Sequence, residues 1–118
     1  MSKSVLIVDD SFAVRSLIKK VMITAGFDKI EEASTGESAI DMALKSNPDV
    51  ITLDNLLPDM LGTDVLKVIM KSDVKSNVVV VSAVDKKSVI KEEIELGAVE
   101  YIVKPFNENE LVDLVNKL

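Results

Sequence analysis

One aspartate, Asp54, directly follows a short apolar run, Val50–Leu53, that predicts a buried strand. Pro58 and Gly62 predict that a loop comes next. In a parallel sheet covered on both faces, ligands and chemistry collect where the strands end. We therefore expect Asp54 to be presented to its surroundings rather than buried, and to be the reacting group of the protein.

Further polar side chains follow the other predicted strands. Asp9 and Asp10 follow the first, Ser82 follows the fourth, and Lys104 with Pro105 follows the fifth. Each has an ordinary explanation when taken alone, because an aspartate pair often caps a helix and a single serine or lysine often lies on the surface. With Asp54, however, they all fall at the carboxyl edge of the same predicted sheet. That coincidence favours a shared site.

Three carboxylates at one edge repel one another and raise each other's pKa unless a cation shares the site. Oxygen ligands and incomplete coordination by protein suit Mg2+, which keeps bound waters and commonly pairs with a phosphate. A carboxylate can accept a phosphoryl group and form an aspartyl phosphate. Phosphoryl transfer mainly requires charge neutralisation, here from a metal ion and a lysine. The side chains therefore predict a magnesium-assisted phosphoryl-accepting site.

Apolar runs alternate with helical patterns along the chain. The runs predict strands at residues 4–8, 29–33, 50–53, 77–82 and 100–103. The patterns predict helices at residues 12–25, between a cap at Ser34 and a stop at Pro48, from Thr63 or its neighbour to about residue 72, at 85–96, and after a cap at Asn107. This alternation implies right-handed crossovers and a parallel sheet with the half-polar run 29–33 at its edge. We expect one α/β domain spanning residues 1–118.

The predicted helices carry apolar residues at the spacing of one face. The expected buried positions are Val14, Leu17, Ile18, Val21, Met22 and Ala25 in the first helix, Ala39, Ile40, Ala43 and Leu44 in the second, and Leu111, Leu114, Val115 and Leu118 in the last. Ser34 and Glu37 have the spacing of a capping box. Gly26 and Gly97 are the expected stops of the first and fourth helices.

The fourth predicted helix has an unusual order of charges. Lysines lie toward its start and glutamates toward its end, namely Lys86, Lys87, Lys91, Glu92, Glu93 and Glu95. This order opposes the helix dipole. Two interpretations stay open: a weakened, mobile helix, or an ordinary solvated face with pairs such as Lys91 to Glu95.

Composition limits the classes of function. The chain has 118 residues, with 47% hydrophobic and 29% charged residues, as in an ordinary globular domain. It lacks cysteine, which excludes thiol chemistry, and its net charge of −6 argues against direct nucleic-acid binding. The apolar run near the N-terminus is too short for a signal peptide or a membrane span, so we expect a cytoplasmic protein without membrane binding.

Four segments carry a resemblance to a known family: VDD (8–10), LDNLLPDMLG (53–62), VSA (81–83) and YIVKPF (101–106). Together they resemble the receiver domain of two-component response regulators, most of all its single-domain chemotaxis members. The match covers the whole chain. It implies a (βα)5 flavodoxin-like three-layer sandwich whose parallel five-stranded sheet has the order 2-1-3-4-5.

The resemblance also implies the roles of the acidic residues. Asp54 would be the phosphoacceptor and a metal ligand. Asp10 would bind Mg2+ directly and Asp9 mainly through water, while the backbone carbonyl of Leu56 would be a further ligand.

The remaining site residues follow from the same resemblance. Ser82 would donate its hydroxyl to a phosphoryl oxygen, and Lys104, ahead of a cis Pro105, would pair with the phosphoryl charge. Tyr101 matches the aromatic side chain that moves inward with the hydroxyl in the activated state. Ser82 and Tyr101 would thus form the switch.

The implied function is a phosphorylation-activated response regulator, with chemotaxis or motility as the expected output. Because the chain has no histidine, the phosphoryl group must come from a histidine kinase, a phosphotransfer protein or a small phosphodonor. Phosphorylation would favour a conformation whose face of fourth helix, fifth strand and fifth helix binds a protein target, such as a motor or an adaptor. We expect a monomer that is no enzyme beyond its own phosphoryl transfer and autodephosphorylation.

Two positions depart from the best-known members of the family. Leu56 lies two residues after Asp54, and Val84 lies two residues after Ser82. In the family, side chains at these positions tune the lifetime of the phosphoryl group. Apolar side chains offer no hydrogen bond to an attacking water, so we expect slow self-dephosphorylation.

Other classes of protein were weighed against this interpretation. An aspartate-nucleophile phosphatase would have an Asp-x-Asp arrangement and a cap domain, whereas Asp9 and Asp10 are adjacent. A flavin- or nucleotide-binding module would have a Gly-, Ser- or Thr-rich loop after the first strand, where VDDSFAVR has no glycine. A receiver domain of a longer, for example transcriptional, regulator and a phosphorylation-independent binding module remain alternatives. A stand-alone protein is preferred, because the last helix finishes without a trailing linker.

Overall fold

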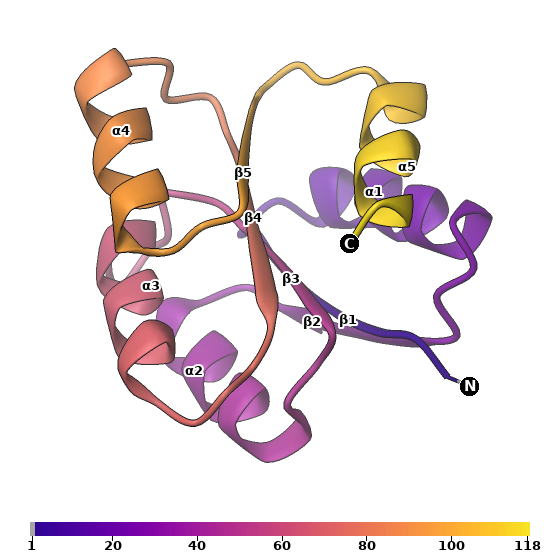
Figure 1. Cartoon of the computed structure of the whole chain (residues 1–118), viewed down its shortest axis with the longest axis horizontal. Helices are drawn as coiled ribbons and strands as arrows, with labels where there is room; N and C mark the ends of the chain where they lie inside the picture. The colour runs from indigo at the N-terminus through magenta and orange to yellow at the C-terminus, as the bar shows by residue number, and fades with distance from the viewer. Residues whose placement is uncertain (1) are drawn as a thin grey trace.

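A computed structural model describes residues 2–118 as three layers, with helices on both faces of a central parallel sheet (Figure 1). Its elements in chain order are β1 Ser4–Val8, α1 Phe12–Thr24, β2 Lys29–Ala33, α2 Gly36–Ser46, β3 Val50–Leu53, α3 Gly62–Lys71, β4 Asn77–Ser82, α4 Lys87–Leu96, β5 Glu100–Val103 and α5 Glu108–Asn116. The sheet has the order β2-β1-β3-β4-β5, and every neighbouring pair is parallel. The predicted flavodoxin-like fold and all five predicted strands are confirmed.

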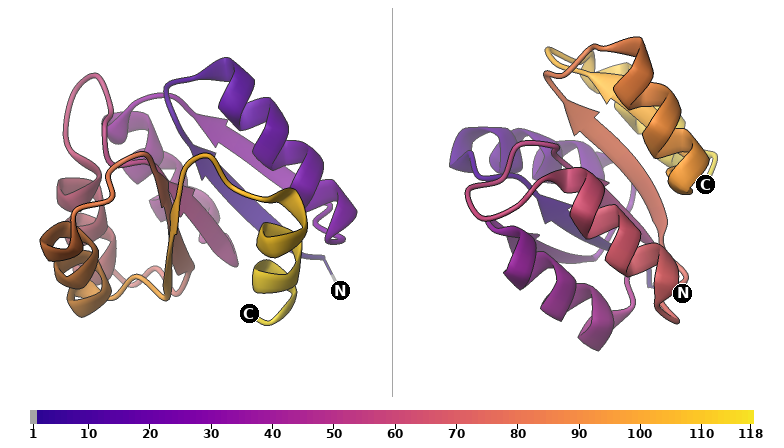
Figure 2. Two further views of the ribbon diagram at one scale, coloured as in Figure 1. Left: turned by 90° about the horizontal axis from the view of Figure 1, so that it is seen from above. Right: turned by 90° about the vertical axis from the view of Figure 1, so that its left-hand side faces the viewer.

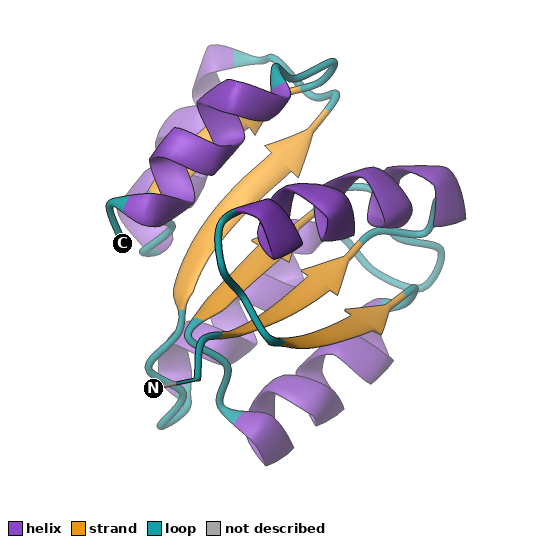
Figure 3. Cartoon of the chain, turned by 90° about the vertical axis from the view of Figure 1, so that its right-hand side faces the viewer, coloured by secondary structure: helices purple, strands orange, loops and turns teal. Residues whose placement is uncertain are grey.

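The sheet divides the apolar interior into two clusters. Along β1, Val5 and Ile7 belong to the cluster beneath α1 and α5, whereas Leu6 and Val8 belong to the cluster beneath α2 and α3. Successive strand residues point to opposite faces, so a strand covered on both sides must be apolar throughout. Figure 2 shows α2, α3 and α4 on one face, and Figure 3 shows α1 and α5 on the other.

The two edge strands are the most polar strands of the sheet. β2 buries only Ala33 fully, and β5 buries only Ile102 fully. In contrast, every residue of β3 is buried, as are residues 78–82 of β4. The prediction that the half-polar run 29–33 forms an edge is confirmed.

The predicted start of α2 was wrong. Thr35, rather than Ser34, is the N-cap, and its hydroxyl accepts a hydrogen bond from the backbone N–H of Ser38 at 3.1 Å. Glu37 lies in the first turn, where the carboxylate of Asp59 accepts from the N–H groups of Gly36 at 2.7 Å and Glu37 at 2.9 Å. A side chain from the loop after β3 therefore does what a local capping box was expected to do.

The other helix limits shift by one or two residues. α3 begins at Gly62 and α4 at Lys87, and neither has a capping side chain. Gly97 ends α4 at φ 123°, and Asn107 caps α5 as predicted. None of the helices within residues 2–118 is both long enough and apolar enough to cross a membrane.

Most of the predicted buried faces are confirmed, but three leucines are exposed: Leu17, Leu44 and Leu118. Leu17 precedes the buried Ile18 and lies about 100° from it around the helix, which turns it away from the sheet. Leu44 directly follows the buried Ala43, so it also lies about 100° away around its helix. Leu118 lies beyond the end of α5 at Asn116.

Candidate phosphoacceptor and metal site

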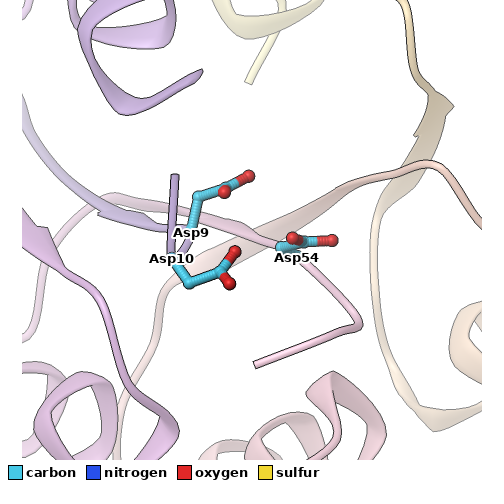
Figure 4. A group of neighbouring side chains, drawn as sticks. All are labelled: Asp9, Asp10 and Asp54. Atoms are coloured by element: carbon cyan, nitrogen blue, oxygen red, sulfur yellow. The ribbon is translucent and has the colours of Figure 1, made fainter. Parts of the chain in front are cut away.

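Three carboxylates meet at the carboxyl edge of the sheet. β1 and β3 are neighbours, and Val8 is paired with Leu53, so the residues that follow these strands emerge side by side. Asp9, Asp10 and Asp54 each offer one oxygen, and these oxygens lie within 4.8 Å of one another (Figure 4). The structure thus brings together the acidic residues that the sequence placed at one edge.

Asp54 is more buried than predicted. It is 7% exposed, and Asp9 is 1% exposed, whereas Asp10 is exposed. The loop that follows Asp54 is closed by two backbone contacts: the N–H of Gly62 donates to the carbonyl of Asn55 at 2.8 Å, and Leu56 forms a bridge with Leu61. The expectation that Asp54 is presented rather than buried was therefore wrong.

Gly62 allows this loop to close tightly. A Cβ atom at Gly62 would lie 2.5 Å from the carbonyl oxygen of Asp54 and 2.8 Å from the Cα of Asn55, closer than such atoms approach one another in proteins. Any larger residue would displace the backbone next to Asp54. The glycine read from the sequence as a loop stop is thus also a packing requirement of the site.

Lys104 joins two of the carboxylates. Its Nζ lies 2.6 Å from Asp9 Oδ2 and 3.4 Å from Asp54 Oδ2. The backbone holds it there, since its N–H donates to the carbonyl of Ser82 at 2.8 Å. As expected, a cis peptide bond links Lys104 to Pro105.

Burial is the largest influence on the Asp54 carboxyl and raises its pKa. The charge of Lys104 lowers the pKa, the charge of Asp9 raises it, and the backbone N–H groups of Asn55 and Leu56 lower it. The Asn55 N–H donates to Asp54 Oδ1 at 2.8 Å. The net shift is upward, so the protein alone does not fully compensate the ionised form of Asp54.

Ser82, the last residue of β4, and Tyr101, in β5, are the two predicted switch residues. Ser82 is fully buried at the end of β4, and its hydroxyl accepts a hydrogen bond from the N–H of Val84 at 3.1 Å. The Tyr101 hydroxyl donates to the carbonyl of Val84 at 2.6 Å and accepts from Asn55 Nδ2 at 3.0 Å. Tyr101 is thus half-buried, with its hydroxyl held between Asn55 and the carbonyl of Val84.

A comparison with protein-family models agrees with this arrangement. Residues 5–116 match the family described as the response regulator receiver domain. The chain belongs to this family. The match includes every candidate residue of the receiver domain site.

Individual relatives of this receiver domain are similar over nearly their whole length. The chain is 37% identical over 118 residues to the chemotaxis protein CheY of Thermotoga maritima, covering 100% of this chain and 98% of that protein. It is 34% identical over 117 residues to sporulation initiation phosphotransferase F of Bacillus subtilis, covering 99% and 94%. A solved structure titled a CheX-CheY-BeF3-Mg complex from Borrelia burgdorferi matches with a TM-score of 0.91 and 32% identity, covering 98% of this chain and 87% of that one.

The acidic side chains of this receiver domain fit a small hard cation. They supply carboxylate oxygens from two strand ends, as Mg2+ prefers. Asp9 is already engaged, because its Oδ1 accepts from the N–H of Ser11 at 2.9 Å and its Oδ2 pairs with Lys104. Asp10 makes neither a hydrogen bond nor an ion pair through its side chain within residues 2–118. The raised pKa of Asp54 also fits a site where a cation supplies the missing positive charge.

Sequence reasoning missed three residues of the receiver domain site. Arg15 donates to the carbonyl of Asp9 at 2.7 Å and pairs with Glu32 at 3.0 Å. Asn55 was passed over although it directly follows Asp54, which was a usable signal. Glu93 is fully buried, although the sequence analysis considered it only as one of the charges of the fourth helix. The Lys91–Glu95 pair that the solvated-face interpretation named is present at 4.0 Å. The expected roles of Leu56 and the other ligands stay predictions.

Proposed function

We propose that this chain is a phosphorylation-activated response regulator that accepts a phosphoryl group on Asp54 from a histidine kinase or a phosphotransfer protein. The observation that carries the proposal is the grouping of Asp54 with Asp9, Asp10 and Lys104 at one strand edge. Membership in the receiver domain family supports it. The absence of histidine from the chain requires the donor to be another molecule.

In the proposed transfer, an ionised Asp54 oxygen attacks phosphorus. An oxygen–phosphorus bond forms, the bond from phosphorus to the donor's nitrogen breaks, and the departing imidazole keeps the electron pair. Mg2+ held by Asp10, Asp54, the Leu56 carbonyl and, through water, Asp9 would supply positive charge against the phosphoryl oxygens.

Two side chains of the chain would hold the phosphoryl group afterwards. Lys104 Nζ, at 3.4 Å from Asp54 Oδ2, is within reach of an oxygen added there. Ser82 has a hydroxyl hydrogen that it can turn toward a phosphoryl oxygen, because in the structure its oxygen serves as an acceptor for Val84. The chain would act only on its own aspartyl phosphate and would have no separate substrate.

The proposed output is binding of a protein target, such as a motor or an adaptor, by the face of α4, β5 and α5. Tyr101 on β5 supports this, since its hydroxyl contacts both the residue after Asp54 and the loop before α4. Similarity to proteins named for chemotaxis supports a role in motility. The same similarity extends over nearly the full length of these proteins, which supports the proposed role as a signalling protein in the cytoplasm.

Intact mass after incubation with Mg2+ and acetyl phosphate tests the proposal. Wild type should gain one phosphoryl group that requires Mg2+, and Asp54→Asn should gain none. Asp64→Asn, which removes an exposed aspartate of α3, is the matched control and should label like wild type. No adduct on a folded wild type with either acetyl phosphate or a phosphorylated kinase would overturn the proposal and favour a phosphorylation-independent binding module.

A further inference from the structure

Arg15, in the first turn of α1, joins this helix to two other parts of the chain. Its Nη1 donates to the carbonyl oxygen of Asp9 at 2.7 Å, and its Nε donates to Glu32 Oε1 on β2 at 3.0 Å. The Phe12 ring lies against the guanidinium group, with 5.8 Å between the ring centroid and Arg15 Cζ. The Arg15 side chain is only 14% exposed. These three contacts fix the position of a planar group that can donate several hydrogen bonds at once.

The contact with Arg15 completes the hydrogen bonding of the Asp9 backbone. The N–H of Asp9 donates to the carbonyl of Ala33 at 3.1 Å, and its Oδ1 accepts from the N–H of Ser11 at 2.9 Å. The carbonyl that Arg15 holds belongs to the peptide between Asp9 and Asp10. Because a peptide group is planar and trans, a fixed carbonyl oxygen also fixes the plane and the Cα atom of Asp10.

Asp10 depends on this backbone for its position. It is exposed, so packing against the interior does not place its carboxylate, which nevertheless lies within 4.8 Å of the carboxylates of Asp9 and Asp54 (Figure 4). Without Arg15, the carbonyl of Asp9, a residue that is 1% exposed, would lose its charged donor. The peptide would then turn toward another donor and would carry Asp10 with it.

We propose that Arg15 is a positioning residue for the divalent cation: by holding the Asp9 carbonyl, it keeps the Asp10 carboxylate where it can share Mg2+ with Asp54. This inference rests on the magnesium site of the proposed function and adds to it a residue outside the three carboxylates. Residues that orient metal ligands typically change metal affinity by a factor of about 10 to 100 when they are lost. We therefore expect loss of the Arg15 contact to weaken Mg2+ binding about tenfold.

Charge alone predicts the opposite effect. Arg15 is a cation and repels Mg2+, so its removal would tighten Mg2+ binding if only its charge mattered. Lys19 offers a matched control, because it is a cation of the same helix and its Nζ lies 3.9 Å from Glu32 Oε2. The bond to the Asp9 carbonyl comes from Arg15 and not from Lys19. Lys19→Gln therefore removes the same charge and leaves that bond in place.

Amide NMR spectra recorded during a titration with MgCl2, at constant ionic strength and without a phosphodonor, report both the fold and the Kd for Mg2+. Arg15→Met removes the donors and keeps an unbranched side chain that suits a helix. It should raise the Kd about tenfold, whereas Lys19→Gln should keep the wild-type Kd or lower it slightly. A Kd for Arg15→Met that is equal to or lower than that of Lys19→Gln would overturn the proposal, as would the absence of Mg2+ binding by folded wild type.

Arg15→Lys is the conservative variant. Its ammonium group restores the charge and one donor but not the fork that serves Asp9 and Glu32 together, so its Kd should lie between those of Arg15→Met and wild type. Charge alone predicts the reverse order, because lysine repels Mg2+ and methionine does not. A Kd as high as that of Arg15→Met, or as low as that of wild type, would contradict the positioning role. The comparison with wild type decides the matter if Arg15→Met does not fold.

Urea unfolding of the metal-free proteins shows whether Arg15 only braces the fold. Arg15→Met also loses the ion pair with Glu32, which joins α1 to β2. Lower stability of Arg15→Met together with the Kd of Lys19→Gln would identify such a brace and would refute a role in metal binding. A raised Kd in a variant whose amide spectrum shows the wild-type fold supports the proposal.

Phosphorylation is measured separately in the same proteins. With acetyl phosphate, the Mg2+ concentration that gives half-maximal labelling should rise in Arg15→Met by the same factor as the Kd. A raised Kd without labelling of any protein, wild type included, would count against the proposed function alone, since the titration uses no phosphodonor. Labelling of wild type together with an Arg15→Met Kd like that of Lys19→Gln would count against the positioning role alone.

Discussion

Leu56 follows Asp54 by two residues and Val84 follows Ser82 by two residues, and neither side chain has polar atoms. The N–H of Leu56 is close enough to lower the pKa of Asp54, and the N–H of Val84 donates to Ser82, yet neither side chain can orient a water. Leu56 is 58% exposed, so its position is open to substitution without repacking the interior.

We therefore predict a slow loss of phosphate from Asp54 and faster loss in the double variant Leu56→Asn, Val84→Glu. The new side chains would offer an amide and a carboxylate to a water near phosphorus. Phosphoryl loss is followed by intact mass after removal of the phosphodonor, with Leu56→Met as the apolar control. Equal or slower loss from the double variant than from wild type would refute this prediction.

Glu93 makes stability depend on pH. Its pKa is raised from 4.5 to about 7 in the folded protein, so the folded state binds more protons than the unfolded state between these values. The contribution of Glu93 to stability is therefore most favourable below about pH 4.5 and falls as pH rises through about 7, by about 3 kcal/mol for a shift of about 2.5 units. The groups that face Glu93 are Glu92 on α4, Asn55 after β3 and Tyr101 on β5, and none of them is basic.

Urea unfolding at a series of pH values, at fixed Mg2+, measures this contribution as the difference between wild type and Glu93→Gln. The amide cannot ionise, while other titrating groups contribute equally to both proteins and cancel. The wild type should lose stability relative to Glu93→Gln as pH rises. A difference that is constant from pH 4.5 to 8 would show that Glu93 titrates normally.

At the scale of elements, helix α2 depends on a side chain from another part of the chain. Asp59, in the loop after β3, accepts hydrogen bonds from the N–H groups of Glu37 and Gly36, and these bonds lower its pKa. A carboxylate at this end of a helix also favours the helix dipole. α2 and the loop that follows Asp54 are thus joined through the carboxylate of Asp59.

We predict that Asp59→Asn lowers the Tm at neutral pH, because it weakens both bonds and removes the charge. Since the pKa of Asp59 is lowered by folding, its stabilising effect is present at neutral pH and is lost as pH falls through the folded pKa. Asp41→Asn is the control, because Asp41 is an exposed aspartate of α2 itself, and this change should leave the Tm nearly unchanged. An Asp59→Asn variant with the wild-type Tm at neutral pH would show that this cap is dispensable.

The helix N-termini show which structural features could be predicted from the sequence and which could not. Asn107 was predicted correctly as a cap because its partner, the N–H of Glu110, is local. The start of α2 was misplaced by one residue, because Ser34 and Thr35 are both good caps and the structure uses Thr35. The carboxylate of Asp59, more than twenty positions away, accepts from the next two N–H groups and could not be found from a local pattern. α4 begins two residues later than predicted, because it has no side-chain cap to mark its start.

At the scale of the whole molecule, the strands and the edge they form were predictable, because β-branched apolar runs mark buried strands and parallel strands end together. Asp9, Asp10, Asp54, Ser82 and Lys104 could be placed at that edge for the same reason. The order of the sheet followed only from the family resemblance. The burial of Glu93 could not be predicted, since it depends on how α4 packs and not on any local pattern.

The tethering of the loop after β3 has a thermodynamic consequence for the proposed reaction. One tie joins Asn55 to Gly62, and a second joins Asp59 to the start of α2. The conformational entropy of this segment is therefore lost when the protein folds. The nucleophile meets its donor on a preorganised segment, so the activation free energy of phosphoryl transfer contains no further cost for ordering it.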